Sequence, residues 1–246
     1  MFRIKTAPLF LLLLALAACT PVEELVPLPP IPDPPKIEAE EALVQADYFV
    51  KIDGWRRNNG NLENFQLSGF LIRHNEQLYV ITAGHVQKKD TKVTDLQIYF
   101  NQDRSVSYGA EIAAINNDID VAVISITSTL FQFSGRLAIL GNSELVSKGD
   151  PVVSLGHPPR LQWHASSGKV ISLSYRNSNV SLAQIQHSAF GGFGSSGGPL
   201  LNGKGEVIGM NISMRTRTTD ETTSDRINAL PSNRIREYLD YAFTKK

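Results

Sequence analysis

The sequence predicts an all-β fold, built as barrels or a sandwich, with a helix near its C-terminal end. Short runs of alternating and β-branched residues recur from about residue 43 onward, and turn residues separate them. No helical pattern intervenes between the runs, which argues against an α/β fold. The clearest runs are Phe70–Ile72, Leu78–Thr82, Leu96–Phe100, Val121–Ile126, Pro151–Leu155, Val180–Gln186 and Glu206–Ile212.

The predicted helix begins near residue 232. Ser232 can cap its N-terminus, and Pro231 suits a boundary. The apolar side chains that fall on one face are Ile235, Tyr238, Leu239 and Ala242. Thr216–Asp225, by contrast, is polar and threonine-rich, and we expect a mobile loop there.

The composition excludes several classes of protein. The 246 residues carry 24 Lys+Arg against 24 Asp+Glu, a balance that argues against a nucleic-acid partner. A single cysteine rules out an internal disulfide and a thiolate zinc cluster. The histidines lack ligand-like spacing, so we expect neither a metal nor an organic cofactor.

Residues 1–18 are predicted to be a secretory signal. Arg3 and Lys5 supply the positive start, and Leu9–Ala17 supplies an apolar stretch too short to cross a bilayer. The following Leu16-Ala17-Ala18-Cys19 resembles the lipobox of bacterial lipoproteins. That resemblance implies lipidation of Cys19, and Thr20 after it implies an envelope protein anchored in the outer membrane and facing the periplasm. The alternative is an ordinary signal cut after Ala17, which leaves a free thiol.

Residues 19–42 are predicted to be a tether. Seven prolines fall in the fifteen positions 21–35, and proline removes backbone donors and fixes φ. We therefore expect an extended spacer between the lipidated cysteine and one folded domain over residues 43–246.

Three short motifs carry the chemistry. A strand runs into Thr82-Ala83-Gly84-His85, Asp120 opens a buried strand, and Ser196 lies in the turn Gly194-Ser195-Ser196-Gly197-Gly198-Pro199. A serine hydroxyl becomes a good nucleophile when an imidazole removes its proton, and that imidazole needs a carboxylate to orient it. Glycines around the serine let backbone N–H groups point at the oxygen that becomes negative. Together these residues are what acyl transfer requires.

The order histidine, aspartate, serine excludes two other scaffolds. The nucleophile elbow of α/β-hydrolases needs an acid and a histidine after the serine, and no histidine follows Ser196. The subtilisin order needs an acid before the histidine within a helix-rich parallel fold, and those helices are absent from the pattern.

Over residues 66–236 the chain resembles the chymotrypsin-fold serine proteases of the bacterial HtrA/Deg type. Ser68-Gly69-Phe70 resembles the family's entry to the first barrel, and Asp120-Val121-Ala122-Val123 resembles its Asp-Leu-Ala-Val. The parallel continues through Leu140–Ser143, Ser154–Pro158, Ser167–Ser172, Gly205–Asn211 and Ala229–Asn233. The resemblance implies two six-stranded antiparallel β-barrels and a C-terminal helix. No sequence remains after that helix for a PDZ domain, so we expect no regulation by one.

The resemblance also implies roles for individual residues. His85 would be the general base and acid, Asp120 its orienting carboxylate and Ser196 the nucleophile. The backbone N–H groups of Gly194 and Ser196 would form the oxyanion hole. Asp118 is a rival for the acid, two residues earlier.

The substrate pocket is predicted from the segment before the serine and from the strand near residue 211. Its residues would be Phe190, Gly191, Asn211, Ile212 and Ser213. Phe190 favours an apolar residue before the cleaved bond. A second interpretation places His187 in the pocket, against a histidine satisfied at the barrel surface. His157, Trp163 and His164 form a loop near the cleft, for which we expect a structural role.

The chain departs from the family at Ser195, where Asn is usual, and at Phe193, where Pro is common. The sequence thus predicts a serine endopeptidase that acts on proteins or peptides. The alternative is a non-catalytic module that keeps the fold and binds a partner.

Overall fold

The computed structural model describes residues 36–244, except residues 59, 89, 159, 178–179, 215–222 and 225. The predicted signal, Cys19 and most of the predicted tether lie outside the described residues. Most of the predicted loop over residues 216–225 does as well. Within the described part of the chain, neither helix is long and apolar enough to cross a lipid bilayer.

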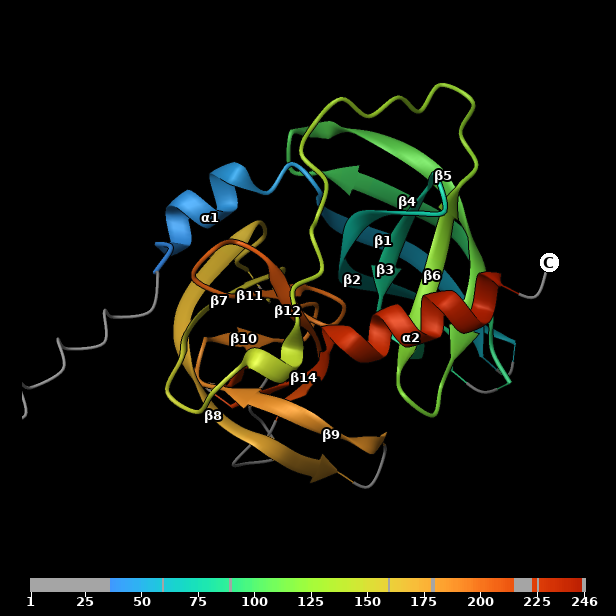
Figure 1. Ribbon diagram of the computed structural model, residues 1–246. Helices are drawn as coiled ribbons and strands as arrows, with labels where there is room; N and C mark the ends of the chain where they lie inside the picture. The colour runs from blue at the N-terminus through green and yellow to red at the C-terminus, as the bar shows by residue number, and fades with distance from the viewer. Residues whose placement is uncertain are drawn as a thin grey trace, which may run out of the picture. The chain divides into compact units, whose positions relative to one another are not determined.

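The first half of the described chain forms a closed antiparallel barrel in the strand order β1-β2-β3-β6-β5-β4 (Figure 1). Pairing of β1 with β4 closes it. Its fully buried side chains include Ile52, Phe70, Ile81, Ile98 and Ile124. The strands span Phe49–Asn58 (β1), Asn61–His74 (β2), Gln77–Thr82 (β3), Lys92–Phe100 (β4), Asp103–Asn116 (β5) and Val121–Ile126 (β6).

The second half forms another closed barrel, in the order β11-β12-β14-β9-β8-β7. A two-stranded sheet of β10 and β13 lies outside that order. The strands span Pro151–Gly156 (β7), His164–Asn177 (β8), Val180–His187 (β9), Gly191–Gly192 (β10), Pro199–Leu201 (β11), Val207–Met214 (β12), Thr223–Ser224 (β13) and Ile227–Pro231 (β14). The prediction of an all-β fold with two six-stranded barrels and a C-terminal helix is therefore confirmed.

The C-terminal helix α2 (Ser232–Phe243) links the two barrels. It follows β14 directly, and its last residue, Phe243, stacks on Tyr79 of β3 with ring centroids 4.7 Å apart. The predicted apolar face is buried at Ile235, Tyr238 and Leu239. The predicted cap is wrong, because Ser232 is the first helical residue and its buried hydroxyl donates to the carbonyl of Gly141.

The folded part of the chain starts before the predicted boundary at residue 43. Helix α1 (Ala39–Gln45) contacts β7 and β8 and buries Ala42. Because this helix follows the proline-rich segment at once, a boundary drawn from proline content alone falls several residues too late.

A buried histidine packs where the barrels meet. The His157 ring stacks on Phe49 at 4.8 Å, and its Nδ1 accepts a hydrogen bond from the Trp163 N–H. Burial lowers the pKa of His157 to about 3, although the Val50 backbone opposes the shift. A second histidine, His187, is buried inside the second barrel rather than at its surface, and burial lowers its pKa to about 4.

These two histidines should make the fold sensitive to acid. In the unfolded chain both take up protons near their ordinary pKa of 6.5, whereas in the folded chain they stay neutral to about pH 3 and 4. Stability is therefore unaffected above pH 6.5 and falls as the pH drops below it, by about 1.4 kcal/mol per pH unit for each histidine. His157→Asn keeps an acceptor near Nδ1 but removes one titration. Urea unfolding from pH 7 to 4.5 should give a shallower loss of stability for this variant, and an unchanged slope would contradict the assignment.

Candidate active site

The neighbouring strands β3 and β6 bring His85 and Asp120 together. Thr82, at the end of β3, pairs with Ala122, at the start of β6. His85 lies in the short 3-10 helix η1 (Gly84–Val86) that follows β3, and Asp120 directly precedes β6. Two residues 35 positions apart in sequence therefore lie side by side.

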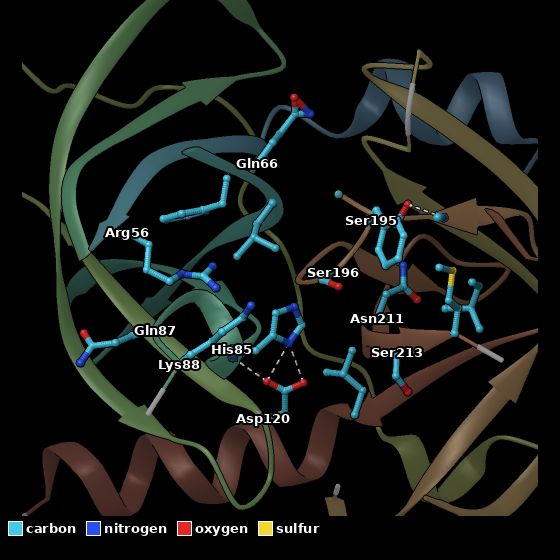
Figure 2. A pocket seen from close by; sticks show the side chains of 18 of the residues that line it. Arg56, Gln66, His85, Gln87, Lys88, Asp120, Ser195, Ser196, Asn211 and Ser213 are labelled. Atoms are coloured by element: carbon cyan, nitrogen blue, oxygen red, sulfur yellow. Dashed lines mark hydrogen bonds and ion pairs between the residues drawn. The ribbon is translucent and has the colours of Figure 1, made fainter. Parts of the chain in front are cut away.

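The Asp120 carboxylate holds both the backbone and the ring of His85 (Figure 2). Its Oδ1 accepts from the His85 backbone N–H at 2.7 Å, and Nδ1 of the ring lies 3.1 Å from Oδ1 and 3.0 Å from Oδ2. Because a carboxylate accepts only, Nδ1 carries the proton. The other ring nitrogen, Nε2, is then left as an acceptor facing the cleft.

The backbone at Asp120 fixes this carboxylate. Asp120 has φ +57°, in the left-handed region where Asp and Asn are enriched, and its side chain is 13% exposed. Asp118, the rival acid, is exposed in the preceding turn, and its N–H donates to Asn116 Oδ1. The contacts to His85 therefore come from Asp120.

Ser196 lies in a tight loop of the second barrel that the first barrel holds. The N–H of Ser68 in β2 donates to the Ser196 carbonyl at 2.9 Å, and the Ser68 hydroxyl donates to the Gly194 carbonyl at 2.7 Å. The Thr82 hydroxyl in turn donates to the Ser68 carbonyl at 2.7 Å. The loop is thus anchored to the barrel that carries His85.

The same loop leaves two backbone donors open. The N–H of Ser195 donates to the Gly192 carbonyl, and the N–H of Gly192 donates to the Ser195 hydroxyl. Among the described residues, no hydrogen bond engages the N–H of Gly194 or of Ser196. Ser195, where the resembled family usually has Asn, is 3% exposed and closes the loop from inside.

His85, Asp120 and Ser196 line one cleft of about 1350 Å³ between the barrels. Figure 2 shows Ser196 beside the His85 ring. Within the described residues no hydrogen bond joins the Ser196 hydroxyl to His85. Such bonds are often long or poorly aligned without substrate, so the arrangement remains compatible with proton transfer between the two.

Three of the five residues predicted for the substrate pocket line the cleft. Asn211, Ile212 and Ser213 line the cleft. For Phe190 and Gly191 the prediction needs correction. The Phe190 ring packs edge-on against His164 at 5.9 Å, and Gly191 pairs with Ser224 in the small sheet. Neither is among the residues that line the cleft in the described chain.

The alternative that placed His187 in the pocket is also wrong, because His187 is fully buried and its Nε2 lies 3.0 Å from Asn211 Oδ1. The Asn211 amide donates to the Ser154 hydroxyl at 2.8 Å, so its Oδ1 accepts from His187. The Asn211 carbonyl also accepts a hydrogen bond from the N–H of Gly197. Asn211 therefore connects β12 both to His187 and to the loop that carries Ser196.

Sequence reasoning missed two residues of the site, Ser68 and Arg56. Ser68 stands out in the sequence only as part of a family motif, and its contacts depend on how the barrels meet. Arg56 was detectable, because strand alternation after Val50 and Ile52 places it on the inward face of the first barrel. Among the described residues, no group of three or more His, Cys, Asp or Glu side chains is arranged to hold a metal ion.

Residues 67–210 match a family described as the trypsin-like peptidase domain. The chain belongs to this family. Among curated proteins, this chain is 31% identical over 202 residues to serine protease HTRA1B of Danio rerio, covering 79% of the chain and 39% of the relative. It is 33% identical over 183 residues to serine protease HTRA1 of Xenopus tropicalis, covering 70% of this chain and 35% of the relative.

The chain is thus HtrA-like, and its matched part spans less than two fifths of the length of these relatives. Its fold is similar to a solved structure described as "HtrA-type protease AlgW with tripeptide", with a TM-score of 0.70 and 19% identity. That match covers 85% of this chain and 65% of the other.

Gly197 should be essential to the loop of this trypsin-like peptidase domain. It has φ +85°, and a Cβ there would overlap the Ser68 carbonyl and the Thr82 hydroxyl. Gly149 has a similar φ of +96°, but a Cβ at that position would meet nothing within 4 Å, so it is the matched control. Gly149→Ala should lower the free energy of unfolding only by the cost of placing a residue with a Cβ in the left-handed conformation, about 1–2 kcal/mol. Gly197→Ala should lower the free energy of unfolding, measured in urea, by clearly more than this. Equal losses in the two variants would contradict the packing argument.

Proposed function

We propose that this chain is a serine endopeptidase that cleaves peptide bonds through an acyl-enzyme intermediate. The observation that carries the proposal is the pair of contacts from Asp120 to His85 in the cleft that Ser196 also lines. In this arrangement the carboxylate fixes the tautomer of the imidazole and stabilises its protonated form.

The proposed reaction begins when Nε2 of His85 takes the proton of the Ser196 hydroxyl. The Ser196 oxygen attacks the substrate carbonyl carbon, and the tetrahedral oxyanion accepts hydrogen bonds from the N–H groups of Gly194 and Ser196. His85 then gives its proton to the leaving nitrogen as the carbon–nitrogen bond breaks. Water, deprotonated by His85, hydrolyses the ester, releasing the carboxylate product and restoring Ser196.

The two open donors support the oxyanion assignment, because the N–H groups of Gly194 and Ser196 have no hydrogen-bond partner among the described residues and are left for a substrate oxygen. The substrate class is supported by related structures, whose descriptions name a tripeptide and a decapeptide. The second candidate, a non-catalytic binding module, shares the cleft and differs only in lacking chemistry.

We further propose that the chain is tethered to the bacterial envelope by a lipid on Cys19, at the periplasmic face of the outer membrane. The support is the sequence Leu16-Ala17-Ala18-Cys19 after a short apolar stretch, together with the proline-rich spacer. Two or more acyl chains hold a protein stably at a membrane, whereas one chain holds it weakly.

A fluorophosphonate tests the enzymatic proposal, because it reacts with an activated serine. The parent chain should be labelled and should cleave casein, and Ser196→Ala should do neither. An unlabelled, inactive parent of intact fold would favour the binding module.

The two acids provide a matched pair for the same assay. Asp120→Asn should keep the backbone, since Asn also tolerates positive φ, and lower the turnover rate by about 10⁴-fold because His85 loses its oriented tautomer. Asp118→Asn should be labelled and should cleave as the parent does. The reverse order would assign the carboxylate role to Asp118.

Cell fractionation tests the tether. In a bacterial host, Cys19→Ala should move the protein from the outer-membrane fraction into a soluble fraction, with the Cys19-dependent lipid signal lost in labelling with a radioactive fatty acid. Membrane association that survives the substitution would contradict the lipid anchor.

A further inference from the structure

A buried arginine projects into the cleft from the first barrel. Along β1 the inward positions Val50 and Ile52 are followed, after Gly54, by Arg56, so a charged side chain ends an otherwise apolar face. Arg56 is 6% exposed and lines the cleft together with His85. Its guanidinium carbon lies 4.9 Å from the centre of the Phe65 ring.

The Arg56 charge has no bonded counter-ion within the described chain. No hydrogen bond or ion pair involves its side chain there, and Nε is buried without a partner. Glu63 faces it across the β1–β2 pair, but that side chain is exposed. Burial lowers the pKa of Arg56 and the Glu63 charge opposes the shift, yet a guanidinium remains protonated in proteins.

A buried charge without a partner is costly, and an anionic ligand group in the cleft would relieve this cost. Lys88, which is exposed, lines the same wall. The charged residues on this wall, Arg56 and Lys88 against Glu63, leave it net positive, because Asp120 is already engaged by His85.

The position of this wall indicates which part of a substrate meets it. Figure 2 places Arg56, Gln87 and Lys88 on one side of the His85 ring and Ser196, Asn211 and Ser213 on the other. Under the proposed mechanism His85 protonates the leaving nitrogen, so the chain that follows the cleaved bond extends past His85 along the first barrel.

We propose that Arg56 determines specificity by binding a substrate carboxylate on the leaving-group side of the cleaved bond. The planar fork of a guanidinium matches a carboxylate with two parallel hydrogen bonds. The carboxylate belongs either to an Asp or Glu side chain or to a free C-terminus a few residues beyond the bond. This inference rests on the proposed endopeptidase function.

The test is a digest of a synthetic peptide mixture, with the cleaved bonds identified by mass spectrometry. From the bonds found, paired peptides are made with Glu or Gln at each of the three positions after the bond, and with a free or amidated C-terminus. At one position the parent should prefer the carboxylate in kcat/KM by about 10- to 100-fold, the discrimination expected of hydrogen bonds to a charged group. The two kinds of pair distinguish a side-chain carboxylate from a terminal one.

Variants assign the preference to one side chain. Arg56→Met should bring the ratio of the paired rates close to one, and Glu63→Gln should raise it by removing a competing charge. Arg57→Met is the matched control, since Arg57 is the next residue in β1 and is exposed, and it should keep the parent ratio. The unfolding temperature of Arg56→Met should not be lower than that of the parent, because the substitution removes a buried unpaired charge.

Cleavage without a carboxylate preference, or with a preference that Arg56→Met retains, would overturn the inference and leave the endopeptidase intact. A parent that neither cleaves nor reacts with fluorophosphonate would overturn both. A clear fall in the unfolding temperature of Arg56→Met, with the ratio unchanged, would assign Arg56 a structural role.

Discussion

Ser68 connects the two halves of the candidate active site through two hydrogen bonds. Its N–H and its hydroxyl hold the carbonyls of Ser196 and Gly194, and Thr82 holds Ser68 in turn. Since His85 and Asp120 belong to the first barrel and Ser196 to the second, a shift between the barrels would separate the imidazole from the hydroxyl. The same two bonds fix the peptide units that follow Gly194 and Ser196, so one residue holds the loop both before and after the serine.

Other contacts also hold the two barrels together. Helix α2 leaves the second barrel and ends with Phe243 stacked on Tyr79 of the first, while His157 stacks on Phe49 near the cleft. These contacts are apolar or uncharged, so they tolerate changes in salt. The cleft itself is different on its two sides. The wall near Asn211 is neutral, and the wall near Arg56 carries charge.

The sequence predicted those parts of the fold that local pattern determines. Runs such as Val121–Ile126 form strands because a short, uninterrupted apolar and β-branched segment is stable when it is buried in a sheet. The long strand β5 showed no comparable run, because half of its residues are exposed, none is buried, and its pairing comes from neighbours. The proximity of His85 to Asp120 followed from motif order and family resemblance. The pocket near Phe190 was placed incorrectly, since that ring turns to His164, a contact between segments that no local pattern encodes.

The left-handed backbone at Asp120 limits how this site can change over generations. Few residue types adopt φ +57° without strain, and the amide counterpart of aspartate is the nearest in shape. Under the proposed mechanism, a change to asparagine at this position would therefore keep the groove and its charged wall while removing turnover. An inactive relative of this chain is accordingly best sought by reading that single position.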